Sequence, residues 1–318
     1  IPPGKTGELK LNLSARWQQA DALALQVKDP TGRELWTWVW PLAGMARCRQ
    51  LVATPSRQTV SALENNEAIE IKAGELVVRI SKQTGLLLSV QRGTQGFSLA
   101  NGPRAALGAA TLTGIEKRSE GSDYVVTASF DGSLRSVTWR VRGNGWVQCA
   151  YTYSANGPQD FHGVLFDYPE SLVAHKKWLG DGPYRVWKNR LRGVSLNVWE
   201  NAYNNTITGW SDWVYPEFKG CFANVRWLQL DTKEGLITAL PGRDDQFVQV
   251  LTPDFPPADL QAKTALSLPR AGLAFLQAIP PIGSKFHAPK DAGPQAQPTI
   301  ALGHYSGAID FYFGPLPR

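Results

Sequence analysis

The feature that most constrains the fold is an alternation of apolar and polar residues that recurs along nearly the whole chain. The run "GELKLNLS" alternates at Leu9, Leu11 and Leu13, and "DALALQVKD" and "ELWTWVWPL" alternate in the same way. A period of two turns one face of a β-strand toward a core, whereas an amphipathic helix repeats every 3.6 residues. Residues 1–45 therefore predict three antiparallel strands, the last two joined by the turn "DPTGRE".

Short strand-like runs continue from Glu67 onward at intervals of about 8–12 residues. Turn-forming pairs such as Thr84-Gly85, Asp131-Gly132 and Asn144-Gly145 separate several of them. No segment shows a sustained helical stripe. We expect an all-β chain with a partial immunoglobulin-like β-domain over residues 1–50, a linker over 51–66, and a large antiparallel β-sandwich over 67–318.

The composition narrows the classes of partner. The 318 residues carry a net charge of +6, but the sequence holds no run of five or six Lys and Arg. The charge-run signature of a nucleic-acid-binding tail is therefore missing, and we expect no nucleic-acid partner. No apolar stretch reaches the length of a transmembrane helix, so we expect no membrane span.

Metal, disulfide and nucleotide signatures are also missing. The three cysteines, Cys48, Cys149 and Cys221, are widely spaced, and Cys149 and Cys221 read as buried small hydrophobic residues. No two histidines stand at metal-ligand spacing, and neither G-x-S-x-G nor G-x-G-x-x-G occurs. We predict no metal, no cofactor and no catalytic residue carried by a local motif.

Two groups of titratable residues remain as candidates. His162 lies in "QDFHGVLFDYP". We favour the interpretation that it is a hydrogen-bonded structural histidine. The alternative is that it acts as an acid or base together with Asp167 or Glu170. Asp244 and Asp245 read as a solvated hairpin tip, with an ion site as the alternative.

The densest chemical signal lies between Trp178 and Gly193, "WLGDGPYRVWKNRLRG". It combines aromatic side chains with four cations and a Gly-Pro turn. Trp and Tyr rings offer apolar faces to sugar rings, and Arg and Asn bind sugar hydroxyls. The segment favours either a sugar-facing cleft or the packing of a sheet corner.

These residues resemble the C-terminal domain of the β-galactosidase-like enzymes of glycoside hydrolase family 2. "WLGDGPYRVWKNR" is similar to that domain's W-y-G-x-G-P-x-E-x-Y-x-D-R, and "YPEFKGCFANVRW" to its Y-x-x-P-Q-E-x-G-N-R-x-x-V-R-W. The opening "SKQTGLLLSVQRG" and the loop "PPIGSKFHAP" match further landmarks in order, and the resemblance covers essentially the whole chain.

The resemblance implies a partial immunoglobulin-like domain followed by a galactose-mutarotase-like β-supersandwich. It also implies a catalytic barrel preceding Ile1 in the same polypeptide, so the chain alone would be a non-catalytic part of a glycoside hydrolase that supports carbohydrate binding. A periplasmic or secreted bacterial location fits such a role.

The resemblance implies a set of substrate-binding residues on the matching positions. These are Tyr184, Arg185, Trp187, Asn189, Arg190, Glu217 and His287. The chain departs from the family where Arg185 replaces a Glu, Asn189 an Asp, and His287 the loop Trp. If these positions face the ligand, the loss of two acids either shifts the expected preference toward an acidic sugar or marks the loss of the active-site role.

Two other functions remain open at this point. One is a free-standing mutarotase-like aldose epimerase or polysaccharide lyase, which needs an acid–base pair. The other is a carbohydrate-binding module, in which sugar affinity would depend on Trp187.

Overall fold

The computed structural model describes residues 2, 4–42, 46–202, 221–250, 267–284 and 286–317. Within these residues the chain divides into two compact units, Ile1–Ala53 and Thr54–Arg318. The expected all-β class is confirmed, because strands dominate the larger unit and form large antiparallel sheets there. No helix in the described ranges is long and apolar enough to cross a membrane.

The N-terminal unit contains a single β-hairpin. Strands β1 (Ala22–Lys28) and β2 (Glu34–Pro41) pair in antiparallel fashion, and the unit also holds η1 (Trp17–Gln19) and helix α1 (Ala46–Ala53). The strand expected over "GELKLNLS" is not formed, since Leu9, Leu11 and Leu13 are exposed and unpaired with any strand in the described part. Alternation alone predicted it, but a strand also needs a neighbour.

The segment expected as a linker, 51–66, contains regular structure at both ends. It holds the end of α1 and the strand β3 (Ser61–Glu64), which pairs with β4 (Ala68–Ala73). The eight-residue helix α1 was not predicted. Its sequence, "ARCRQLVA", is too short and too polar to show a helical stripe.

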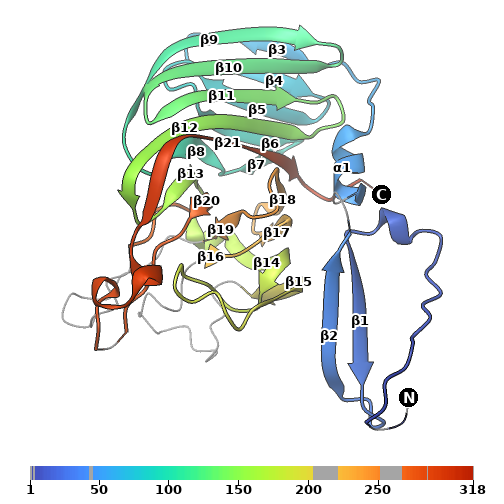
Figure 1. Ribbon diagram of the computed structural model, residues 1–318. Coiled ribbons are helices and arrows are strands. Elements are labelled where there is room, and N and C mark those ends of the chain that lie inside the picture. Colours follow the sequence, from blue (N-terminus) through green and yellow to red (C-terminus); the bar gives the residue numbers. More distant parts are fainter. Residues whose placement is uncertain are drawn as a thin grey trace. The chain divides into compact units, whose positions relative to one another are not determined.

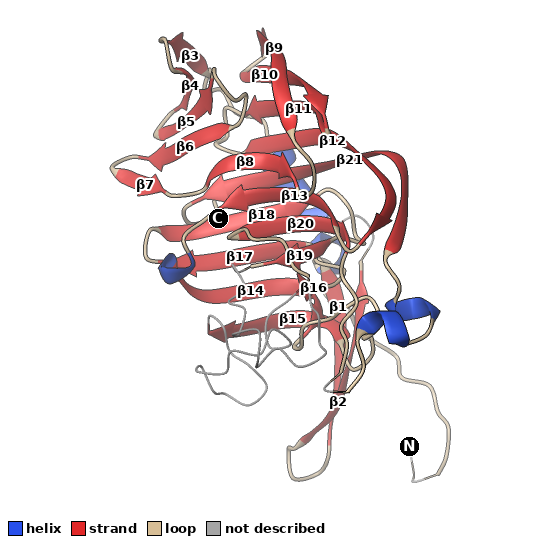
Figure 2. Ribbon diagram, turned by 90° about the vertical axis from the view of Figure 1, so that its left-hand side faces the viewer, coloured by secondary structure: helices blue, strands red, loops and turns tan. Residues whose placement is uncertain are grey.

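Nine strands build the first layer of the larger unit. They run in the order β15-β14-β17-β18-β21-β12-β11-β10-β9, and all of the pairs are antiparallel (Figures 1 and 2). Their bounds are Ala110–Glu120 (β9), Asp123–Gly132 (β10), Leu134–Val141 (β11), Val147–Gln159 (β12), Val173–Gly182 (β14), Ser195–Ala202 (β15), Trp227–Thr232 (β17), Gly235–Pro241 (β18) and Thr299–Phe313 (β21).

Two five-stranded sheets form the second layer. The first runs β3-β4-β5-β6-β7, with β5 over Leu76–Ser81, β6 over Leu87–Arg92 and β7 over Gln95–Phe97. The second runs β16-β19-β20-β13-β8, with bounds Cys221–Phe222, Phe247–Gln249, Leu273–Ala278, His162–Asp167 and Ala100–Ala105. Short 3-10 turns lie at Glu170–Leu172 (η3), Pro289–Asp291 (η5) and Pro294–Ala296 (η6).

One apolar cluster joins the two layers. Phe166 of β13 contacts Trp139 of β11, Phe275 of β20 and Phe311 of β21, with ring centroids 6.5, 6.1 and 5.4 Å away and the rings edge to face. All four side chains are fully buried. Edge-to-face aromatic pairs add stability beyond the area they remove from water. This contact holds the second layer against the nine-stranded sheet.

The expected turns occur where the sequence placed them. Gly132 ends β10 with φ +110°, and Gly145 precedes β12 with φ +84°. Both values lie in the region that only glycine adopts without strain. At the second turn the Asn144 side chain accepts a hydrogen bond from the Trp146 main-chain N–H at 3.2 Å.

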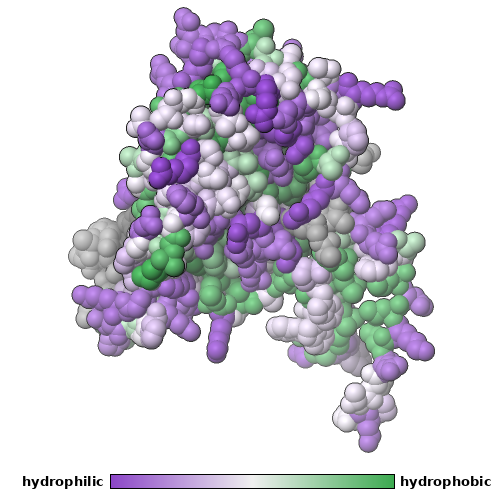
Figure 3. Space-filling model, turned by 45° about the horizontal axis from the view of Figure 1, so that its top comes forward, coloured by the Kyte–Doolittle hydropathy of each residue, from purple (hydrophilic) through white to green (hydrophobic). Residues whose placement is uncertain are grey.

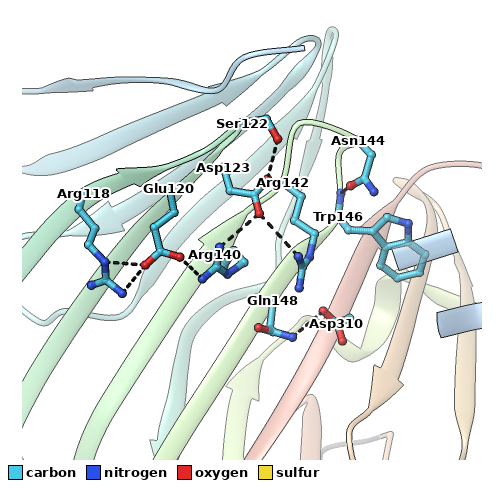
Figure 4. Close-up of polar contacts among 10 residues, drawn as sticks. All are labelled: Arg118, Glu120, Ser122, Asp123, Arg140, Arg142, Asn144, Trp146, Gln148 and Asp310. Carbon is cyan, nitrogen blue, oxygen red and sulfur yellow. Dashed lines mark hydrogen bonds and ion pairs between the residues drawn. The ribbon is translucent and has the colours of Figure 1, made fainter. Parts of the chain in front are cut away.

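A ladder of charges crosses the face of strands β9–β11 (Figure 4). Arg140 forms ion pairs with Glu120 and with Asp123, and Arg142 also approaches Asp123. Hydrogen bonds from Arg140 and from Arg118 hold the pKa of Glu120 below its usual range. Glu120 and Asp123 lie directly opposite each other on β9 and β10, and Arg140 bridges the two carboxylates, which keeps this face polar while the opposite face packs into the core.

We expect Phe166→Ala to lower the free energy of unfolding by about 3–5 kcal/mol, because it opens a cavity where the two layers meet. Leu88→Ala on β6, where the side chain is exposed, is the matched control and should change stability by less than about 0.5 kcal/mol. Urea unfolding followed by circular dichroism measures both. Equal effects of the two variants would contradict the central role of Phe166.

Candidate functional site

A cavity of about 180 Å³ opens where β12, β13 and the segment after β8 meet. Its walls are Ala105–Gly108, Ser133, Tyr153–Asn156, Gln159, His162 and Gly163. Pockets for drug-sized ligands measure about 300–1,000 Å³, so this cavity takes a smaller molecule. None of the lining residues is a Lys, Arg, Asp or Glu.

His162 is the basic side chain among the residues that line this cavity. It is the first residue of β13, and only 4% of its surface is exposed. The next residue, Gly163, has no room for a Cβ, because the Phe275 carbonyl oxygen lies 2.2 Å from its ideal position. A bulge between these two residues interrupts the pairing with β20. Bulges re-aim side chains, and this one sets the direction of the imidazole.

A chain of hydrogen bonds fixes the tautomer of His162. The Tyr153 hydroxyl donates to Gln277 Oε1 at 3.0 Å, and Gln277 Nε2 donates to the Ser306 carbonyl at 3.1 Å. The hydroxyl proton is thereby used, so His162 Nδ1, 2.8 Å from the Tyr153 oxygen, carries the hydrogen of that contact. Nε2 is then an acceptor, and the described residues offer it no hydrogen bond.

Aromatic rings surround the imidazole. Tyr305 of β21 lies 4.5 Å from the His162 ring and stacks on Tyr153 with centroids 5.4 Å apart and an interplanar angle of 19°. The Tyr305 hydroxyl accepts the Leu302 main-chain N–H at 2.9 Å. These rings leave His162 little freedom to rotate.

Burial keeps both polar groups neutral. It lowers the pKa of His162 below the usual 6.5 and raises the pKa of Tyr153 far above its usual range. At neutral pH the imidazole is therefore an uncharged base and the phenol stays protonated.

The expected partner Asp167 does not reach His162. Asp167 closes the same strand, five residues and therefore about 16 Å away. It forms an ion pair with Arg104 and accepts a hydrogen bond from Asn101 at 2.7 Å. Glu170 lies farther along the chain in η3. The structure therefore does not support an acid–base pair of His162 with Asp167, and its pairing with Glu170 stays a prediction.

The other acidic candidates form ion pairs. Arg226 contacts Asp244 at 2.7 Å and Arg243 contacts Asp245 at 2.7 Å, so an ion site is not favoured there. In the described ranges no three His, Cys, Asp or Glu side chains gather as metal ligands. Cys149 and Cys221 are buried free thiols, as expected.

Several residues of the expected sugar site contact main chain instead. Asn189 exchanges two hydrogen bonds of 2.9 Å with Ile282, and Arg190 donates to the Gly283 carbonyl at 2.8 Å. Trp187 is buried in a second apolar cluster. These contacts fasten the loop after β20 to the turn at 187–190.

The remaining candidates are dispersed. Tyr184 is exposed, Arg185 is half-buried, and Glu217 lies outside the described residues. His287 closes a turn in which its main-chain N–H donates to Ser284 Oγ at 3.0 Å. Their role in substrate binding stays a prediction, and the structure places none of the described ones on the cavity beside His162.

A second buried basic side chain lies on β14. Lys176 is 2% exposed, and its ammonium donates to the Ala202 carbonyl at 3.3 Å and lies 5.7 Å from the Phe222 ring. Burial, reinforced by the nearby positive charge of Arg185, lowers its pKa from 10.5 to about 7. Folding therefore carries a charge penalty at neutral pH.

Sequence reasoning missed Tyr153, Gln277 and Tyr305. The alternation in "CAYTYS" placed Tyr153 on an inward face. The pairing of β12 with β21, which brings Tyr305 opposite Tyr153, joins residues about 150 positions apart. No local signal in the sequence encodes that pairing.

Comparisons with known proteins bear on the fold. No protein-family model and no curated protein matches the sequence. The chain is similar to a solved galactose 1-epimerase from Lactobacillus acidophilus NCFM, with a TM-score of 0.44, 9% identity and coverage of 81% of this chain and 99% of that one. It is also similar to a proposed mutarotase (YeaD) from Salmonella typhimurium, with a TM-score of 0.38, 10% identity and coverage of 84% and 99%.

These comparisons correct the expectation drawn from glycoside hydrolase family 2. The similar structures are described as whole epimerase-like proteins, nearly all of each is covered, and neither is described as part of a glycosidase. The expectations of a β-galactosidase-like hydrolase and of missing catalytic domains as partners are wrong. Short motifs in the same order misled, because they mark turns and packing rather than chemistry. The likenesses assign no activity to this chain.

We expect Lys176→Met to raise the free energy of unfolding at pH 7, by at most about 4–5 kcal/mol, the equivalent of the displaced pKa. The unfolded amine keeps its proton up to pH 10.5 and the folded one loses it near 7, so the native protein gains stability as pH rises across that window.

The variant should lose that part of the pH dependence, as urea unfolding at pH 7 and 10 would show. The control is Lys177→Met, because the neighbouring Lys177 is partly exposed and paired with Glu200. The difference in the free energy of unfolding between wild type and Lys176→Met should be larger at pH 7 than at pH 10. An equal difference at the two pH values would contradict the burial of a strained charge.

Proposed function

We propose that this chain binds one aldose ring in the cavity beside His162 and interconverts its two anomers, as an aldose 1-epimerase does. The observation that carries the proposal is the buried chain from Gln277 through Tyr153 to His162, which leaves a neutral Nε2 as acceptor. The cavity is small, and its uncharged lining includes Ser133, Asn156 and Gln159. Such a lining suits the hydroxyls of a neutral sugar.

The reaction needs one proton to leave O1 and one to reach the ring oxygen O5. Both oxygens are bonded to C1, so a single imidazole can serve them in turn. Nε2 takes the O1 proton, the C1–O5 bond breaks, and the same proton passes to O5. The open aldehyde rotates about C1–C2, and the reverse steps close the other anomer. Atoms and charge balance with His162 as the only titrating group.

The cavity disfavours the alternative of a polysaccharide lyase. Lyases act on uronates, whose carboxylate must be neutralised before the neighbouring proton is removed. No cation is among the residues that line this cavity. The lining also gives no support to the acidic sugar expected from Arg185 and Asn189.

Sugar binding without turnover is the second candidate. It is favoured by one observation, the position of Asp167 at the far end of β13, which leaves His162 without a carboxylate partner. The two candidates predict the same affinity for an aldose but different rates.

We expect the protein to accelerate mutarotation of D-galactose or D-glucose, and His162→Gln to lower kcat by about 100-fold or more. Magnetisation-transfer NMR between the anomeric protons measures the rate at pH 7. His175→Gln, on the exposed face of β14, is the control and should leave the rate unchanged. Binding without turnover would support the second candidate, and the absence of both would overturn the proposal.

The pH dependence follows from the same residue. Because burial lowers the pKa of His162, the neutral base persists below pH 6.5, and the acid limb of kcat/KM should lie below that value. A limb above pH 6.5 would contradict the assignment.

We expect Tyr153→Phe to lower kcat by about tenfold with KM unchanged, because one hydrogen bond that fixes the tautomer is lost. The ¹⁵N shifts of His162 should then report a mixture of the Nδ1–H and Nε2–H forms. A fall in rate with no change of tautomer would show that Tyr153 acts on packing instead.

A further inference from the structure

The hairpin of the N-terminal unit carries an apolar face on which three Trp side chains are exposed. In the antiparallel register Val27 lies opposite Trp36, Leu25 opposite Trp38 and Leu23 opposite Trp40. Directly opposed residues project from the same side of a sheet. One face therefore presents a row of three Trp on β2 beside a row of three aliphatic side chains on β1. Apolar side chains gather over this unit at the lower right of Figure 3.

The exposure of this face is unusual. Trp36, Trp38 and Trp40 are 54, 45 and 46% exposed, and no described side chain of residues 1–53 is buried. An isolated two-stranded sheet is at best marginally stable in water. The hairpin therefore needs a surface against its apolar face.

The area of the face matches the centre of a dimer interface. A buried Trp contributes up to about 250 Å², so three half-exposed Trp and the neighbouring aliphatic groups offer about 400–500 Å². A stable interface of standard size removes about 800 Å² from each partner, with an apolar centre and a polar rim. Monomeric proteins rarely expose an apolar patch of this size without a function.

The face is complementary to itself. A two-fold axis parallel to the strands, lying between two such hairpins, exchanges the two rows. The Trp row of one copy then lies over the aliphatic row of the other, so large side chains face smaller ones at the spacing of a β-sandwich. A symmetric interface uses the same patch on both copies. We propose that this face, centred on Trp38, binds the same face of a second copy of the chain.

The side chains that flank the Trp row argue against a polysaccharide as the main ligand of this face. Sugar platforms present aromatic rings flanked by hydrogen-bonding side chains, whereas Leu23, Leu25 and Val27 flank the Trp row here. Aliphatic neighbours gain from contact with other apolar groups and offer nothing to sugar hydroxyls.

Sedimentation velocity of the whole chain between about 1 and 200 μM tests the proposal. We expect a dimer whose dissociation constant rises by about 30-fold or more in Trp38→Lys, since central interface Trp residues are hot spots. The double variant Trp36→Ser/Trp40→Ser introduces no charge at the centre of the face. It should weaken the dimer as well.

The matched control carries Val39→Ser, because Val39 pairs with Ala24 and projects from the opposite face of β2. It should keep the dimer intact. A monomer at 200 μM would overturn the proposal, as would a dimer that resists both Trp variants. Retention of monomeric wild-type protein on cellulose or chitin, lost in Trp38→Lys, would assign the face to polysaccharide instead.

Discussion

The contact on which the larger unit depends is the aromatic packing around Phe166. Phe166 belongs to the second layer, whereas Trp139 and Phe311 belong to the nine-stranded sheet. Sheets have no intrinsic affinity for one another except through such apolar faces, so this contact decides where the second layer lies. The candidate site depends on it directly, because His162 and Phe166 are on the same short strand, β13.

Polar groups in this interior stay uncharged or form ion pairs. His162 is buried and neutral, held by Tyr153 and Gln277, and the thiols of Cys149 and Cys221 are buried and protonated. Lys176 is the exception, since its amine has one long hydrogen bond and a depressed pKa. Burial therefore gives the chain one neutral base beside a cavity and one strained amine elsewhere, and only the first has the surroundings of a site.

The charged and aromatic turn that dominates the sequence has a different role from the one it suggests. The side chains of Asn189 and Arg190 form hydrogen bonds with the main chain of Ile282 and Gly283. The sequence pattern by which they resemble a glycosidase domain corresponds here to contacts that hold a loop in place. The candidate site lies instead at the start of β13, where a glycine and a bulge accompany one buried imidazole.

The sequence by itself determined the strands, because period-two alternation and the Asp-Gly and Asn-Gly turns act over a few residues. It also determined that Cys149 would be buried. The tertiary structure alone decided which strands pair, that residues 8–14 stay outside a sheet, and that Tyr153, Gln277 and His162 meet. The contacts of Tyr153 with Gln277 and with Tyr305 join positions more than a hundred residues apart, and no local pattern encodes the neighbour a strand will find.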